Sequence, residues 1–226
     1  ATNRPNPALA NTVPAPSTNL GAAAPRSLLL YGGAIQLNLQ EVPLMGSPEA
    51  PVVVVGLHDY GCHHCRIMHG HLAQVRREFS NQLAIVSLPM PLNPNCNSTV
   101  KRTHPDHVNS CEYARMGLAV WRANRQALEK FDDWIFTPER PPPPFEVQSF
   151  AEQLVGSNAF HQALQDPWID RQLQQGVSIY ATNYLHFKQG SMPQLIIGSN
   201  VVVGALGSAT DLYPLLAKQP GMRKGP

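Results

Sequence analysis

Residues 51–66 read PVVVVGLHDYGCHHCR. The apolar, mostly β-branched run over residues 51–57 is typical of a strand that is buried on both faces. Over residues 64–79 apolar side chains recur at steps of three and four, which predicts a helix with one core-facing stripe. Cys62 and Cys65 therefore lie where a buried strand gives way to a helix.

This position gives Cys62 a chemical role. The unpaired backbone N–H groups and the dipole at a helix start favour a thiolate over a thiol, and the thiolate is the nucleophile in disulfide exchange. Cys65 follows within one helical turn, so it can close a small disulfide as the resolving thiol. We predict a reversible redox pair that needs no cofactor, because the sulfurs themselves carry the redox equivalents.

The two residues between the cysteines are His63 and His64. An imidazole beside the Cys62 sulfur stabilises the thiolate, and a stabilised reduced form makes the disulfide a stronger oxidant. We therefore predict that both histidines tune Cys62 and that the chain oxidises protein dithiols. A disulfide isomerase or reductase is the first alternative.

A Cys-x-x-Cys spacing also occurs in protein cores and in zinc sites. Met68 and several histidines lie near the pair, and such side chains suit copper or zinc. A metal-binding module is therefore a second alternative, although we assign no metal ligand. The strand before the pair and the helix after it favour the redox interpretation.

The rest of the chain continues as a second buried strand, a helical block and a closing strand–strand–helix unit. Residues 198–200, Gly-Ser-Asn, supply the turn of a terminal hairpin. The expected strands are 34–39, 83–88, 194–197 and 201–203, and the expected helices are 108–124, 125–136, 145–154, 167–185 and 209–218.

Over about residues 45–218 the sequence resembles the thioredoxin superfamily, and within it the DsbA-like disulfide oxidoreductases. The matching features are Asp59-Tyr60-Gly61-Cys62-His63-His64-Cys65-Arg66, the helical block, and Ser191-Met192-Pro193-Gln194-Leu195-Ile196-Ile197-Gly198. The resemblance implies an α/β protein disulfide oxidoreductase. Its expected thioredoxin fold has a helical insertion, about 99–186, between the βαβ and ββα halves of a domain over 27–220, followed by a tail over 221–226.

The same resemblance implies that Pro193 is a cis-proline facing the cysteine pair. Met192 and Pro193 would then line the groove in which a substrate pairs as an extended strand. An ordinary trans-proline at a strand start is the alternative. Relatives usually carry threonine or valine where this chain has Met192.

A second departure concerns proton transfer. Many relatives place a buried acid six residues before the first cysteine, where this chain has Gly56. We interpret Asp59 as a turn residue, and we expect water or His58 to carry the proton of the inner thiol.

Cys96 and Cys111 complete an even count of four cysteines. A structural disulfide between them would close a loop of about fifteen residues, with a stabilisation of ~3 kcal/mol, and it suits an oxidising compartment. Free buried thiols, a metal site with His104 and His107, and a second redox-active pair are the alternatives.

The stretch over residues 94–114 also resembles thioredoxin-like domains found beside vitamin K epoxide reductase homologues. This likeness implies a membrane quinone-linked enzyme as the recycling partner. We expect the protein substrates to be reduced or misoxidised.

Composition limits the remaining partners. The net charge of +2 and the scattered basic residues exclude a nucleic-acid role, and no apolar run approaches the ~20 residues that span a bilayer.

Residues 1–26 are rich in proline and alanine, which predicts a disordered linker. It either tethers the domain to an anchor outside this chain or has no partner. We expect a periplasmic or extracytoplasmic monomer.

Overall fold

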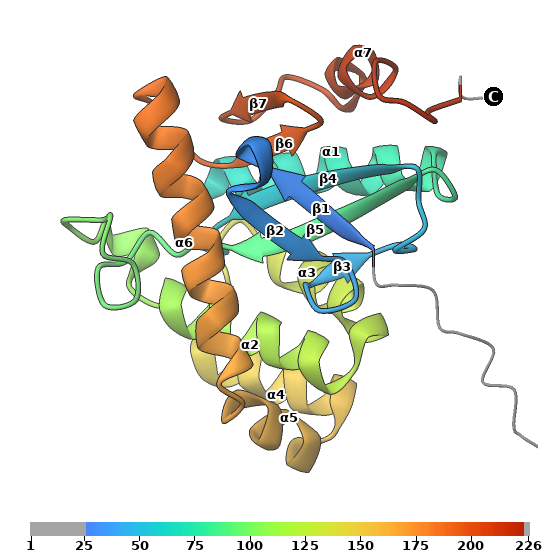
Figure 1. Ribbon diagram of the computed structural model, residues 1–226. Helices are drawn as coiled ribbons and strands as arrows, with labels where there is room; N and C mark the ends of the chain where they lie inside the picture. The colour runs from blue at the N-terminus through green and yellow to red at the C-terminus, as the bar shows by residue number, and fades with distance from the viewer. Residues whose placement is uncertain (1–25, 224–226) are drawn as a thin grey trace, which may run out of the picture.

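The computed structural model describes residues 26–223, and a five-stranded sheet lies at its centre (Figure 1). The strand order is β3-β5-β4-β6-β7. The strands are β3 (Leu44–Met45), β4 (Val52–His58), β5 (Leu83–Pro89), β6 (Gln194–Ile197) and β7 (Asn200–Val203). The central strand β4 pairs in parallel with β5 and antiparallel with β6, while β6 and β7 form the expected hairpin.

The connections between these strands follow the predicted order. Helix α1 (His63–Glu78) joins β4 to β5, as parallel neighbours require a crossover. Five helices then precede β6, and a short helix follows β7. The five are α2 (Ser110–Ala123), α3 (Leu128–Phe136), α4 (Pro144–Val155), α5 (Ser157–Leu164) and α6 (Trp168–Phe187). The α/β class, with a helical insertion between a βαβ and a ββα half, is confirmed.

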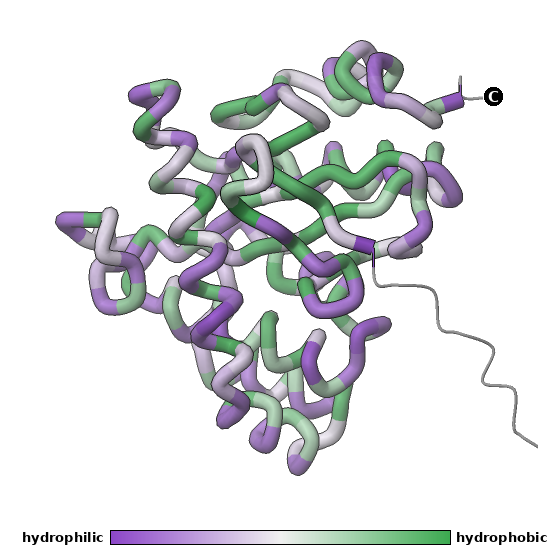
Figure 2. Tube along the Cα trace, viewed as in Figure 1, coloured by the Kyte–Doolittle hydropathy of each residue, from purple (hydrophilic) through white to green (hydrophobic). Residues whose placement is uncertain are grey.

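Both faces of the sheet are covered, which explains the continuous apolar run of β4. Val52 and Val54 pack on one face in a cluster with Met68 of α1, and Val53 and Val55 pack on the other in the larger core. Because side chains alternate along a strand, a strand between two covered faces points apolar side chains to both sides, as residues 52–57 do here. Figure 2 shows hydrophobic residues concentrated along these central strands.

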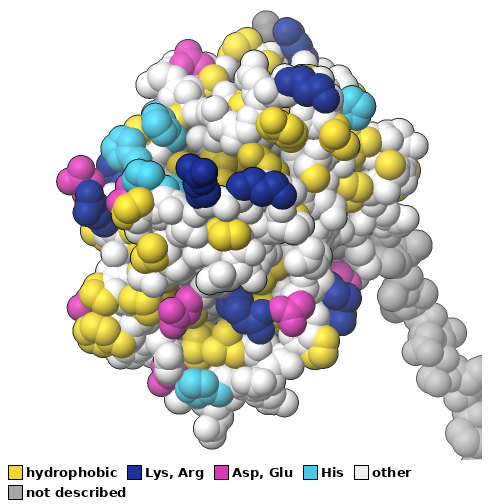
Figure 3. All heavy atoms as spheres, turned by 90° about the vertical axis from the view of Figure 1, so that its left-hand side faces the viewer, with side chains coloured by type: hydrophobic (Ala, Val, Ile, Leu, Met, Phe, Trp, Pro, Cys, Tyr) yellow, Lys and Arg dark blue, Asp and Glu magenta, His cyan; other side chains and the backbone are white. Residues whose placement is uncertain are grey.

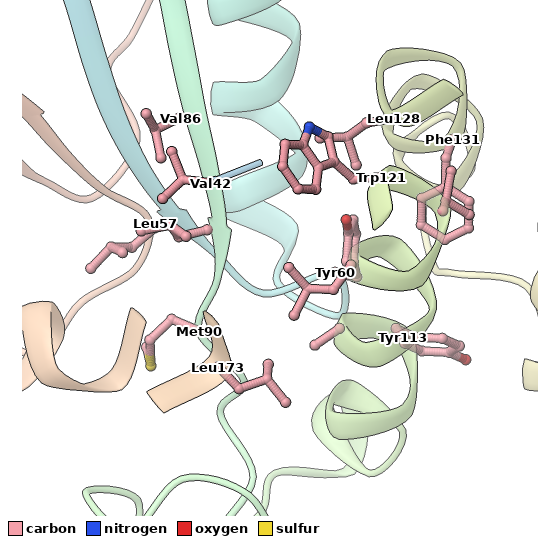
Figure 4. Close-up of a cluster of buried hydrophobic side chains, with 14 of the residues drawn as sticks. Val42, Leu57, Tyr60, Val86, Met90, Tyr113, Trp121, Leu128, Phe131 and Leu173 are labelled. Atoms are coloured by element: carbon pink, nitrogen blue, oxygen red, sulfur yellow. The ribbon is translucent and has the colours of Figure 1, made fainter. Parts of the chain in front are cut away.

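The insertion packs against the turn that follows β4, through an aromatic cluster (Figure 4). The ring of Tyr60 meets that of Phe131 edge-on, with 5.9 Å between centroids. Helix α2 can approach Tyr60 closely because residue 117 is glycine, and a Cβ there would overlap the Tyr60 hydroxyl. The helical insertion and the turn between β4 and α1 therefore share one core.

Several short elements differ from the sequence prediction. A separate two-stranded sheet pairs β1 (Ser27–Leu30) with β2 (Ile35–Asn38), and β1, β3 and α5 were not predicted. The closing helix predicted over 209–218 is shorter and not continuous: a 3-10 turn, Ala209–Leu212, leads into the four-residue α7 (Tyr213–Leu216). Pro214 has no N–H to donate to residue 210, as a continuous α-helix would require.

Two expectations at the chain ends fall wholly or partly on residues that are not described. The linker predicted over 1–26 lies outside the described residues except for Arg26, as do the last three residues of the predicted tail. Within residues 26–223 no helix combines the length and apolar character needed to cross a bilayer.

Candidate active site

Cys62 is the N-cap residue of α1. Its Sγ accepts a hydrogen bond from the backbone N–H of Cys65 at 3.3 Å, so one unpaired donor of the helix start points at the sulfur. Both cysteines are free thiols; Cys62 is 8% exposed and Cys65 1%. Both residues are buried, and Cys62 is the more exposed of the two.

The two thiols differ in acidity. Hydrogen bonding from the Cys65 side chain, helped by the Cys65 backbone N–H, lowers the pKa of Cys62 although burial opposes the shift. Burial, together with the bond and charge of Cys62, raises the pKa of Cys65 well above its ordinary value. This arrangement favours the thiolate at Cys62 and the protonated thiol at Cys65.

Asp59 is fully buried beneath the turn between β4 and α1. Its carboxylate accepts hydrogen bonds from the backbone N–H groups of Gly61 and Leu92, both at 2.6 Å, and from the Ser110 hydroxyl at 2.8 Å. The Nδ1 of His107 donates a further bond at 3.1 Å. Asp59 is thus a turn residue, as expected, but it also binds the segment after β5 to the active-site turn.

Cys96 and Cys111 form a disulfide, with 2.05 Å between the sulfurs. Neither sulfur is then a free thiol or a metal ligand, so these two alternatives are wrong for this structure. Within residues 26–223 no group of three or more His, Cys, Asp or Glu side chains is placed to hold a metal ion.

The other predicted site residues surround the pair. His63 and His64 are both exposed, and His63 Nδ1 lies 3.3 Å from the Arg66 guanidinium. The Met192–Pro193 peptide bond is cis. Pro193 and Cys65 line the same cavity, of about 40 Å³. The tuning and substrate-binding roles of these residues stay predictions.

The cavity beneath Cys65 is also lined by Gly56, His58 and Ser87. Burial lowers the pKa of His58 to about 3, and its buried Nε2 has no hydrogen-bond partner within residues 26–223. His58 is therefore neutral at ordinary pH and is a weak base.

A buried acid does lie near this cavity, although not at position 56. Asp132 of α3 accepts hydrogen bonds from the Tyr60 hydroxyl at 2.7 Å and from the Ser87 hydroxyl at 3.1 Å. Burial raises the pKa of its carboxyl to about 6. No local sequence pattern indicates this contact, because Tyr60 and Asp132 are 72 residues apart in the chain.

The carboxyl end of β4, the start of α1 and the loop after β5 lie together on the left-hand side of Figure 1. Figure 3 faces that side and shows histidine side chains gathered beside hydrophobic ones.

The fold and the site define a thioredoxin-fold oxidoreductase. The sequence model of the family described as thioredoxin matches residues 39–207, so the chain belongs to that family. This match confirms the predicted superfamily. No curated protein matches the chain in sequence.

Solved structures share the fold at low sequence identity. The thiol-disulfide exchange protein α-DsbA2 from Wolbachia pipientis is 17% identical, with a TM-score of 0.63 over 78% of this chain and 86% of that one. The catalytic domain of Proteus mirabilis ScsC is 17% identical, with a TM-score of 0.62 over 79% and 89%. A periplasmic thioredoxin-like protein from Salmonella enterica serovar Typhimurium is 16% identical, with a TM-score of 0.59 over 79% and 90%.

Proposed function

We propose that this chain oxidises the dithiols of protein substrates through Cys62 and Cys65. The observation that carries the proposal is the contrast between the two sulfurs, since the pKa of Cys62 is lowered and that of Cys65 is raised. A stabilised Cys62 thiolate stabilises the reduced form, which makes the Cys62–Cys65 disulfide a stronger oxidant.

The exchange proceeds in two displacement steps from the disulfide form. A substrate thiolate attacks Cys62 Sγ, the bond to Cys65 breaks, and Cys65 leaves with the electron pair and takes up a proton. The second substrate thiolate then attacks the substrate sulfur of the mixed disulfide and releases Cys62 as a thiolate. The substrate has lost two electrons and two protons; the chain holds both electrons and one proton, and the other proton enters solvent.

Met192 and Pro193 form the proposed binding edge for the substrate backbone. The shared cavity of Pro193 and Cys65 supports this assignment, because it brings the segment before β6 next to the cysteine pair. His63 and His64 stand at the exposed side of the pair, where an imidazolium would favour the Cys62 thiolate as a substrate leaves.

We place the protein in an oxidising compartment such as the periplasm. The Cys96–Cys111 disulfide supports this location, and so does the Salmonella structure described as periplasmic. There it would act as a monomer on reduced or misoxidised proteins and be reoxidised by a membrane quinone-linked enzyme.

The oxidised chain, mixed with a peptide that contains two cysteines, tests the proposal. We expect stoichiometric peptide oxidation with the natural chain and none with Cys62→Ser. Reduced Cys65→Ser, mixed instead with the disulfide form of the peptide, should form a mixed disulfide: the Cys62 thiolate attacks the peptide disulfide, one peptide sulfur leaves as a thiolate, and no Cys65 thiol is present to release the adduct. Equilibrium with glutathione should give a potential above thioredoxin's value of about −270 mV; an equal or lower potential would contradict the oxidase role.

Two further measurements separate the alternatives. Repair of a protein with wrongly paired disulfides, without net oxidation, would identify an isomerase instead. Tight copper or zinc binding that thiol blocking abolishes, without any peptide oxidation, would identify a metal-binding module.

A further inference from the structure

We propose that His107 is a positioning residue for the exchange reaction, and that the Cys96–Cys111 disulfide holds it against the turn that presents Cys62. This inference rests on the proposed function, because it takes Cys62 as the attacking and leaving sulfur. It gives the second disulfide a role in the chemistry of the first pair.

His107 docks on the active-site turn through Asp59. It ends the 3-10 turn Pro105–His107, and its Nδ1 lies 3.1 Å from Asp59 Oδ1. The Asp59 side chain is 0% exposed and that of His107 14%. The same carboxylate oxygen accepts the Ser110 hydroxyl at 2.8 Å, so the contact belongs to a buried polar network.

The backbone of this segment also lies directly on the turn. A Cβ at Gly61, next to Cys62, would collide with the carbonyl oxygen of Asp106 and would lie 3.1 Å from His107 Nδ1. On the other side the Asn93 side-chain amide donates to the carbonyls of His107 and Val108, both at 3.0 Å. The segment is therefore held from two directions.

The disulfide closes the loop that contains His107. Cys111 lies four residues after His107, and Cys96 lies at the other end of an irregular stretch after β5. Both sulfurs lie within 4.0 Å of the Asn93 carbonyl oxygen, next to the amide that binds the His107 backbone. Without the crosslink, ordering this stretch would cost additional chain entropy.

The contact matters because of the charges around Cys62. The negative charge of Asp59 disfavours the Cys62 thiolate, and the positive charge of His107 favours it. Burial lowers the pKa of His107, but the hydrogen bond to Asp59 and the charges of Asp59, Cys62 and Asp106 outweigh burial and raise it. A positive charge on His107 therefore offsets the opposing negative charge of Asp59.

Other polar groups complete the surroundings of His107. The His104 ring lies 6.1 Å away between centroids, and its Nδ1 lies 3.4 Å from Asp106 Oδ2. His104 Nδ1 also accepts the backbone N–H of Asp106 at 3.4 Å and so caps the turn that ends at His107. The control is therefore His161 of α5, which is 52% exposed and pairs with Glu152.

The first test is His107→Gln, which can keep a hydrogen bond to Asp59 without the positive charge. Thiolate absorbance should show the pKa of Cys62 raised by about one unit. The equilibrium with glutathione should move up to about tenfold towards the disulfide form, or about 30 mV to a lower potential. His161→Gln should change neither quantity. Unchanged values in His107→Gln, with exchange still dependent on Cys62, would overturn this inference and leave the proposed function standing.

The second test concerns the disulfide and uses the pair Cys96→Ser/Cys111→Ser. It should raise the pKa of Cys62 and lower the potential, in the same directions as His107→Gln. Adding His107→Gln to this pair should shift neither the pKa of Cys62 nor the potential any further, because both changes remove the same contact between His107 and Asp59. Fully additive shifts would show that the disulfide does not act through His107. If the serine pair does not fold, Cys96→Ala/Cys111→Val, which retains apolar volume, replaces it.

Discussion

Asp132 is a buried carboxyl that should make the stability of the folded protein depend on pH. Burial raises its pKa from 3.8 to about 6, so the folded state binds this proton more tightly than the unfolded chain does. The stabilisation is complete below about pH 4 and is lost as the pH rises through about 6. The corresponding fall in the free energy of unfolding is about 3 kcal/mol.

Urea unfolding of the natural chain and of Asp132→Asn between about pH 4 and pH 7 measures this contribution. The amide cannot ionise, so the variant should lose that part of the pH dependence. Glu139→Gln changes an exposed carboxyl on the segment after α3 and should retain it. An equally steep fall in Asp132→Asn would assign the pH dependence to other groups.

Single residues of this site were predictable where the signal is local. Cys62 and Cys65 lie three positions apart between two strongly patterned segments, so the sequence alone located them. Asp59 and His107 are 48 residues apart in sequence and meet only in the folded chain. No periodicity or spacing connects Asp59 with His107, so the sequence indicates His107 only as a candidate metal ligand.

At the scale of elements, two glycines in helices should respond in opposite ways to alanine. In α2 a Cβ at Gly117 would overlap the Tyr60 hydroxyl and lie 3.2 Å from Phe131, while Tyr60 is held by its bond to Asp132. We expect Gly117→Ala to destabilise the protein by about 1–3 kcal/mol through overpacking. In α1 a Cβ at Gly70 meets nothing within 4 Å, so Gly70→Ala should stabilise by up to about 1 kcal/mol.

Urea unfolding of both variants distinguishes packing from helix propensity. If Gly117→Ala were as stabilising as Gly70→Ala, the insertion would not be packed tightly on the active-site turn. A stabilising Gly117→Ala would also mean that the hydrogen bond to Asp132 does not hold the Tyr60 ring in place.

Element prediction succeeded where the apolar pattern is long. The helices with a clear stripe were placed with ends close to those of α1, α2, α4 and α6. Three short elements, β1, β3 and α5, were missed, because a segment such as the two-residue β3 is too short to display a period. The positions of β3 and α5 depend on pairing with β5 and on packing against α2.

For the whole molecule, the redox state of the Cys62–Cys65 pair should be linked to folding stability. The folded pKa of Cys62 is lowered relative to an unperturbed thiol, so the reduced folded form gains stability that the disulfide form lacks. This gain is complete above the pKa of the unfolded thiol and is lost as the pH falls through the folded pKa. The Tm of the reduced form should therefore fall relative to that of the oxidised form on acidification.

Calorimetry of both forms across this pH range checks the linkage. Reduction must spare the Cys96–Cys111 disulfide, which mass spectrometry after alkylation verifies. Cys62→Ser has no thiolate at position 62 and provides the control, because its stability should lack this pH-dependent component. A constant difference in Tm between the two redox forms at every pH would mean that folding does not stabilise the Cys62 thiolate. The disulfide would then have no oxidising strength beyond that of an unstructured Cys-x-x-Cys peptide.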